Sequence, residues 1–148
     1  MIATRRYECI ARPDELPALL GFLDSACVDD ALPDDVVFSV RLAAEEACTN
    51  VIMHGYRDRE PGPLAVAISR EERRVVVTIT DRGIAFDMAD APAPTLDAPA
   101  EERAIGGLGW HLIRNVMDEI HQQHDASSGN TLTLIKHIPP GPPAGDTC

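Results

Sequence analysis

Long apolar runs and clustered cysteines are both lacking in this sequence, and each absence excludes a class of protein. Only 4% of the 148 residues are aromatic, and each apolar run spans a few residues, too few to cross a bilayer. The first residues contain no apolar run of signal-peptide length, so we expect a cytoplasmic protein. The cysteines lack the CxxC spacing of a zinc site and the density of a disulfide scaffold, which predicts reduced structural thiols. They are Cys9, Cys27, Cys48 and Cys148.

Basic residues are also in short supply. The chain has 13 Lys and Arg against 24 Asp and Glu, a formal net charge of −11. Such a charge repels phosphate backbones and anionic lipids, so we expect neither nucleic acid nor a membrane as a direct partner. The length and the 45% hydrophobic content suit one domain with a hydrophobic core. We predict that this domain covers residues 1–138, and that the PPGPPAGDTC tail at 139–148 is disordered.

Hydrophobic periodicity indicates the order of elements. Alternating or β-branched residues predict strands at 2–11, 64–69, 74–80, 119–124 and 131–138. Apolar residues at helical spacing predict helices at 13–27, at 33–55 and from about 110. Residues 88–105 have no apolar period and are expected to form a long lid. We expect residues 88–109 to be mobile without a ligand and ordered with it. The order favours a two-layer α/β sandwich, in which helices cover one face of a mixed, mostly antiparallel sheet.

The second predicted helix carries three polar residues at four-residue intervals: Glu46, Asn50 and His54. This interval places them on one face of the helix, about one turn apart. A carboxylate and an amide in that arrangement could hold a hydrated divalent cation and a nucleophile beside a phosphate. Taken alone, the row is explained more simply by an exposed helix flank.

Two further segments are compatible with ligand binding. Asp81 follows a predicted strand and precedes Gly83, so its carboxylate could face a planar ligand while the backbone bends closely around it. A plain turn would use the same residues. The third predicted helix begins with a glycine-rich segment whose backbone N–H groups could bind an anion, although a flexible hinge is the alternative. That segment is Gly106, Gly107, Leu108 and Gly109.

The order of the three segments is more specific than any one of them. An EACTNxxxHGY helix, a DxG strand end and a GGLG helix start resemble, in this order, the N, G1 and G2 boxes of the GHKL ATPase superfamily, which has the Bergerat ATP-binding fold. The short chain, the form of the helix motif and the final SGNTLTL strand most resemble the bacterial serine/threonine-protein kinases that act as anti-sigma factors. The resemblance extends over residues 1 to about 138.

This resemblance implies ATP and Mg²⁺ as cofactors and assigns the helix residues. Glu46 would be the catalytic carboxylate that activates the attacking hydroxyl. Glu45 is a weaker candidate because it points about 100° away around the helix. Asn50 would bind Mg²⁺, and His54 of the HGY sequence would lie in the ATP site.

The remaining assignments concern the base and the phosphates. By the resemblance, Asp81 would accept a hydrogen bond from the adenine amino group, Gly83 would leave room for the base, and Thr133 would complete the adenine pocket. The glycine-rich segment, which is Gly106, Gly107, Leu108 and Gly109, would lie against the triphosphate. Two positions depart from the family pattern. Ala85 stands where a second glycine is usual, and Arg103 lies further before the glycines than the lid arginine often does.

The function implied by the resemblance is that of an ATP-dependent serine protein kinase and anti-sigma factor. It would phosphorylate an anti-anti-sigma partner and, in the alternative complex, sequester a sigma factor. The relatives often dimerise through the sheet edge, so a homodimer is a further expectation. The alternative is a nucleotide-dependent partner-binding module without significant kinase activity. The ATPase domain of a histidine kinase is disfavoured, because no helix with a phospho-accepting histidine precedes the second predicted helix.

Overall fold

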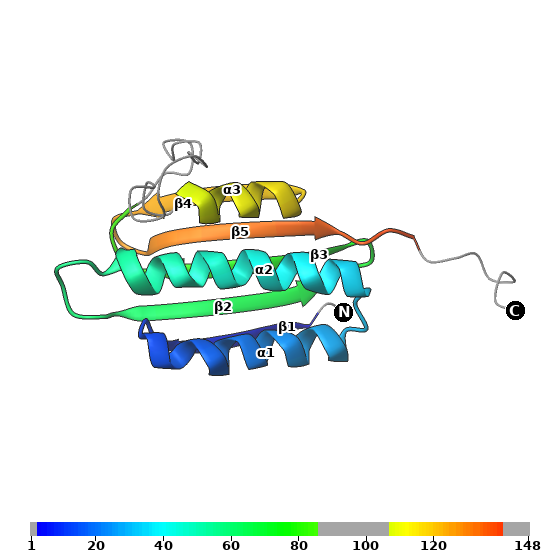
Figure 1. Ribbon diagram of the computed structural model, residues 1–148, viewed down its shortest axis with the longest axis horizontal. Coiled ribbons are helices and arrows are strands. Elements are labelled where there is room, and N and C mark those ends of the chain that lie inside the picture. Colours follow the sequence, from blue (N-terminus) through cyan, green and yellow to red (C-terminus); the bar gives the residue numbers. More distant parts are fainter. Residues whose placement is uncertain (1–2, 86–106, 141–148) are drawn as a thin grey trace, which may run out of the picture.

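The computed structural model describes residues 3–85 and 107–140, which form a sheet and a layer of helices (Figure 1). The helices are α1 (Leu16–Asp29), α2 (Asp34–Asn50) and α3 (Gly107–Val116), with a 3₁₀ turn (Pro13–Glu15) before α1 and a π-helical turn (Val51–Gly55) after α2. The strands are β1 (Thr4–Ile10), β2 (Pro63–Arg70), β3 (Arg74–Asp81), β4 (Glu119–Asp125) and β5 (Gly129–His137).

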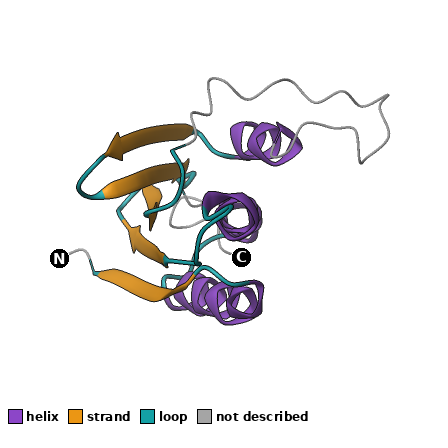
Figure 2. Ribbon diagram, turned by 90° about the vertical axis from the view of Figure 1, so that its left-hand side faces the viewer, coloured by secondary structure: helices purple, strands orange, loops and turns teal. Residues whose placement is uncertain are grey.

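The sheet has the strand order β1-β2-β3-β5-β4, and every neighbouring pair is antiparallel. Figure 2 shows the three helices on one side of the sheet. The predicted two-layer sandwich with a mostly antiparallel sheet is therefore confirmed. Side chains alternate along β3, so Val75, Val77 and Ile79 are buried against the helices.

β1 is an edge strand, as the alternation at residues 2–11 predicts. Tyr7 points toward the helices and stacks on Phe22 of α1, with ring centroids 5.6 Å apart. The apolar residues of α1 that recur at helical spacing, including Leu19 and Leu23, are fully buried. This contact holds α1 over β1 and leaves the centre of the sheet to α2.

α2 begins after Pro33 with Asp34 and Asp35 in its first turn, where negative charge complements the helix dipole. Its buried face carries small residues, such as Ala43 and Ala47, which allow the helix to lie close to the sheet. The helix predicted to run to about residue 55 is α-helical only to Asn50. A π-helical turn completes it, so His54 does not follow Asn50 by an α-helical step.

Several predictions fall on residues outside the described ranges. These are the lid at 88–105, the glycine Gly106 and the tail from residue 141 onward, all of which stay predictions. Across residues 3–85 and 107–140, no helix combines the length and the apolarity needed to span a membrane.

Candidate functional site

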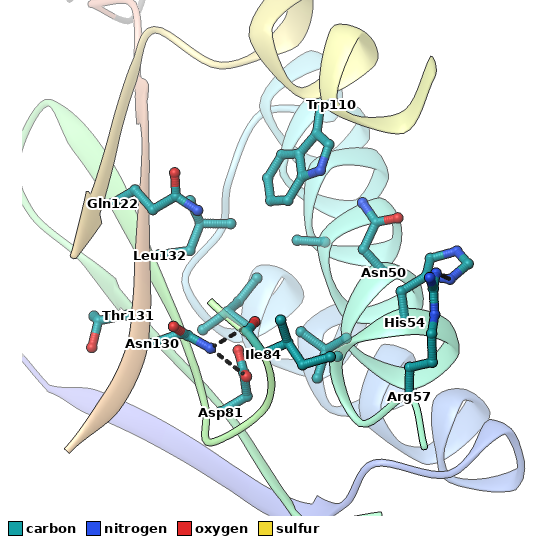
Figure 3. A pocket seen from close by; sticks show the side chains of 14 residues that line it. Asn50, His54, Arg57, Asp81, Ile84, Trp110, Gln122, Asn130, Thr131 and Leu132 are labelled. Carbon is teal, nitrogen blue, oxygen red and sulfur yellow. Dashed lines mark hydrogen bonds between the residues drawn. The ribbon is translucent and has the colours of Figure 1, made fainter. Parts of the chain in front are cut away.

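A pocket of about 350 Å³ lies between the helical layer and one end of the sheet (Figure 3). Its walls come from α2 with the π-helical turn, from the ends of β3 and β5, from β4 and from the first turn of α3. The residues that line it are Ala47, Asn50, Val51, His54, Gly55, Arg57, Ile79, Asp81, Ile84, Trp110, Gln122, Asn130, Thr131 and Leu132.

The strand register builds the floor of the pocket from two cross-strand rows. In one row, Leu132 of β5 pairs with Ile79 of β3 on one side and with Gln122 of β4 on the other, so the row is apolar except at Gln122. The next row is polar and pairs Asp81 of β3 with Asn130 of β5. A flat apolar surface thus ends at a carboxylate and an amide.

Asp81 is a buried carboxylate, with 9% of the residue exposed. Its Oδ1 accepts hydrogen bonds from the backbone N–H of Gly83 at 2.7 Å and from Nδ2 of Asn130 at 2.9 Å. Such donors are needed because a buried charge without hydrogen bonds is costly. Both bonds use the same oxygen, so Oδ2 can accept from a ligand in the pocket.

The turn after β3 is fastened to the end of the π-helical turn. A Cβ atom on Gly83 would lie 2.3 Å from the carbonyl oxygen of Gly55, closer than atoms can approach. The next residue, Ile84, donates its backbone N–H to that carbonyl at 2.7 Å. Close packing of two backbones therefore requires glycine at position 83. Sequence reasoning did not identify this requirement.

Tyr56 connects the same two segments. Its hydroxyl accepts a hydrogen bond from the backbone N–H of Arg82 at 2.8 Å and donates to the carbonyl of Pro63 at 2.6 Å. The HGY and DxG motifs, separated in the sequence, are thus in direct contact. The position of Tyr56 within the HGY motif is the sequence signal that could have identified it as a residue of the site.

Ala85 stands at the second glycine position of the family pattern without backbone strain. Among the described residues other than glycine, only Ala31 and Asp58 have a positive φ, at 52° and 63°. Ala85 is therefore outside the left-handed region that favours glycine.

Glu46 and Asn50 of α2 lie against the first turn of α3. A Cβ atom on Gly109 would be 2.8 Å from Oε2 of Glu46 and 3.5 Å from Nδ2 of Asn50. Burial, and secondarily the negative charge of Glu45, raises the pKa of Glu46 above its ordinary value. Nδ2 of Asn50 is buried and has no hydrogen-bond partner within the described structure.

His54 lies on the pocket wall beside Arg57, whose Nη2 is 3.3 Å from Nδ1 of the imidazole. Burial, and secondarily the positive charge of Arg57, lowers the pKa of His54. The imidazole is therefore favoured in its neutral form.

The sequence predictions for the other site residues have different outcomes. Gly107 and Gly109 lie at the start of α3, as expected of an anion-binding helix terminus, and Leu108 lies between them. The prediction that Thr133 completes the adenine pocket is corrected, because Thr133 does not line the pocket. The buried Leu132 and Leu134 face the helices, and strand alternation puts Thr133 on the opposite face of the sheet.

Asn130 is the residue of β5 that lies beside Asp81 in the pocket, whereas the resemblance assigned completion of the adenine pocket to Thr133. Trp110 and Gln122 also line the pocket and were not predicted, although Trp110 directly follows the glycine-rich segment. Figure 3 shows Trp110 and Gln122 at the end of the pocket away from Asp81.

The fold and this site define a nucleotide-binding domain of the histidine kinase type. A family model described as histidine kinase-like ATPase domain matches residues 9–136, and the protein belongs to this family. The resemblance to the GHKL superfamily is thereby confirmed.

Within this family, the chain is similar to proteins named serine-protein kinase RsbW. It is 31% identical over 108 residues to the one from Bacillus cereus (strain AH820), and 34% identical over 113 residues to the one from Bacillus licheniformis. Each alignment covers 70% of this chain and 66% of the relative. The chain therefore spans just under two thirds of the length of these curated relatives.

Two solved structures share the fold. The crystal structure of the RsbU and RsbW domains of Rv1364c from Mycobacterium tuberculosis has a TM-score of 0.67 at 16% identity, over 93% of this chain and 33% of that chain. A histidine kinase domain from the blue-light activated histidine kinase of Erythrobacter litoralis has a TM-score of 0.55 at 17% identity, over 83% and 61% of the two chains.

Proposed function

We propose that this protein binds ATP with Mg²⁺ and transfers the γ-phosphoryl group to a serine of a partner protein. The observation that carries the proposal is a pocket with two chemically different ends. A buried carboxylate, Asp81, lies at one end of an apolar floor, and Asn50 lines the α2 wall. Glu46 does not line the pocket but lies, with Asn50, against the first turn of α3. The first end suits a flat base with an amino group, and the second suits phosphates.

The adenine base would lie on the apolar row formed by Ile79 and Leu132. Its amino group would donate to Oδ2 of Asp81, because Oδ1 is already used by the fold. Guanine presents a carbonyl oxygen at the corresponding position, which a carboxylate repels. The proposal therefore includes a preference for ATP over GTP.

The donor set beside α3 fits a hydrated Mg²⁺ ion. Nδ2 of Asn50 makes no hydrogen bond within the described chain, so the amide can turn its oxygen toward an ion at no cost to the fold. Asn50 would hold the ion together with phosphate oxygens and water. When bound, Mg²⁺ neutralises charge on the phosphoryl oxygens.

Glu46 would act as the general base. Its carboxylate would accept the proton of the serine hydroxyl as the oxygen attacks the γ-phosphorus atom, and the bond from that phosphorus to the bridging oxygen would break to release ADP. The raised pKa supports this role, because a base is most effective when its pKa lies closer to the working pH. The N–H groups at the start of α3, near Gly107 and Gly109, would contact the phosphates.

The proposed partners follow from the family resemblance and from the similarity to proteins named serine-protein kinase RsbW. The acceptor serine would lie on an anti-anti-sigma-type protein, and a sigma factor would be sequestered in the alternative complex in the cytoplasm. A homodimer belongs to the same proposal. It is supported by the two edge strands of the described sheet, β1 and β4, which can pair with another chain.

Transfer of labelled phosphate tests the catalytic part of the proposal. Proteins that co-purify with the chain in the presence and absence of ATP are isolated and incubated with the purified protein, Mg²⁺ and γ-labelled ATP. Label on a serine of a partner, absent with Glu46→Gln, is the expected result. ATP binding without transfer would instead support the alternative, a nucleotide-dependent partner-binding module, and label on a histidine would contradict both.

A further inference from the structure

A polar row crosses three strands at the Asp81 end of the pocket. Asp81 of β3 pairs with Asn130 of β5, and Asn130 pairs with His124 of β4. The row lies on the helix-facing side of the sheet, because the residues two positions away, Ile79 and Leu132, are buried on that side. His124, an exposed residue on an edge strand, is thus connected to the buried carboxylate.

The orientation of the Asn130 amide is set by the atoms around one of its ends. Nδ2 lies 2.9 Å from Oδ1 of Asp81, 3.1 Å from the carbonyl oxygen of Gly83 and 3.3 Å from that of Ile84. A carboxylate and two carbonyls can only accept hydrogen bonds. The end of the amide that faces them must therefore be the NH₂ group.

The other end of the amide faces His124. Oδ1 of Asn130 lies 2.6 Å from Nδ1 of the imidazole. An amide oxygen only accepts, so Nδ1 must carry the proton in this contact, in the neutral or the charged form of the ring. His124 thus donates to Asn130, and Asn130 donates to Asp81.

We propose that His124 is a positioning residue of the nucleotide site, an inference that rests on the proposed ATP binding. By donating from Nδ1, it holds the Asn130 amide in the one orientation that offers NH₂ to Asp81. Oδ1 of Asp81 is then occupied, and Oδ2 stays directed to the amino group of the bound base. Without the donor, the amide oxygen loses its contact with His124, the amide is held only from its NH₂ end, and the anchor that Asn130 gives the carboxylate is weakened.

Three substitutions of His124 distinguish the effect of its N–H donor from the effect of the size of its ring. His124→Asn keeps an N–H group at a similar distance from the backbone, His124→Leu removes it, and His124→Asp replaces it with an acceptor. His121→Leu is the matched control. His121 is exposed on the same strand, points to the opposite face of the sheet and contacts Glu119.

The ligands are ATP and purine riboside triphosphate, whose base lacks the exocyclic amino group. Binding is followed by fluorescence of Trp110, the only tryptophan, which lines the pocket. With His124→Leu, we expect ATP to bind roughly 3- to 10-fold more weakly and the analogue to change less than about twofold. With His124→Asp, the loss for ATP should exceed about tenfold, whereas His124→Asn and His121→Leu should stay within about twofold of the native protein.

Nitrogen NMR of the His124 ring gives a readout that does not depend on nucleotide. The native protein should show a protonated Nδ1, and Asn130→Ala should abolish that signature without loss of the folded spectrum. Equal losses for the two nucleotides, an unaffected His124→Leu variant or an unprotonated Nδ1 would each overturn this inference alone. Failure of the native protein to bind either nucleotide would overturn the proposed function, and this inference with it.

Discussion

The two ends of the pocket differ in how far the fold satisfies their polar groups. At the base end, Asp81 accepts two hydrogen bonds, and the turn after it is tied to Gly55 and Tyr56. At the proposed phosphate end, Nδ2 of Asn50 is buried and has no hydrogen-bond partner among the described residues, and burial raises the pKa of the neighbouring Glu46, which does not line the pocket. The first end is built before any ligand binds. The second keeps one polar group, Nδ2 of Asn50, that no described residue satisfies and that a ligand can use, which is how functional sites commonly depart from the rules that stabilise a fold.

The glycines of the two ends show the same difference. Gly83 and Gly129 lie against backbone carbonyls, those of Gly55 and Asp81, and a Cβ atom on either would come within 2.3 Å of the oxygen. Gly109 instead faces the carboxylate of Glu46, the far end of a flexible side chain. Glycine is therefore required at positions 83 and 129 by backbone packing, whereas at position 109 its absent side chain leaves room for the carboxylate of Glu46.

The largest effect is expected at the proposed phosphate end, from loss of the general base Glu46. Glu46→Ala should reduce phosphoryl transfer by about 10² to 10⁴-fold and leave nucleotide affinity within a few fold, because a general base acts in the transition state. Transfer assays and calorimetry on the same sample measure both quantities. Normal transfer by the variant would make Glu45 the candidate.

A smaller effect is expected at the base end from Asp81→Asn. ATP should bind about 10- to 100-fold more weakly, since a charge-assisted hydrogen bond in a buried site contributes roughly 1.5 to 3 kcal/mol. Calorimetric titration of the native protein should also show that GTP binds poorly. Equal affinities for ATP and GTP would remove Asp81 from the role of base acceptor.

Substitution of alanine for Gly83 at one end and for Gly109 at the other tests the comparison directly. Gly83→Ala should lower the free energy of unfolding by about 1–3 kcal/mol, because its Cβ atom meets a backbone oxygen. Gly109→Ala should leave the stability unchanged or raise it by up to about 1 kcal/mol, since alanine favours a helix, yet it should reduce transfer by displacing Glu46. Denaturant unfolding and transfer assays separate these outcomes, and a destabilised Gly109→Ala would contradict the distinction.

The smallest effects concern the pH dependence of Glu46. Its pKa is raised from the ordinary value of 4.5, first by burial and then by Glu45. The folded state therefore favours the protonated form, and this contribution to stability is present below the unfolded pKa and lost as pH rises through the folded pKa. Glu46→Gln should be neutral to slightly stabilising at neutral pH, and the difference should vanish in acid.

The same shift predicts the acid limb of the transfer rate. It should lie at a higher pH than for an ordinary glutamate, and Glu45→Gln should move it to lower pH by removing the second cause of the shift. A profile of kcat/KM against pH measures both. An acid limb that Glu45→Gln leaves in place would show that the charge of Glu45 does not act on the base.

Much of the fold could be predicted because its signals are local. The β-branched run before Asp81 and the apolar spacing of α1 and α2 determine strands and helices through contacts within a few residues. The ends of elements were less accurate. α2 continues into a π-helical turn at Val51–Gly55, and Gly55 at its end packs against the turn at Gly83, a contact between segments far apart in the sequence.

The sequence by itself determined the order of the elements and several of the residues that meet in the pocket, since these follow from local periodicity and from motif residues such as Asn50 and Asp81. Only the tertiary structure decided which residue of β5 lies beside Asp81. Register is set by pairing between strands far apart in the chain, and a shift of one residue exchanges the two faces of a strand. That is why Asn130, which pairs with His124, lies beside Asp81, and Thr133 does not line the pocket.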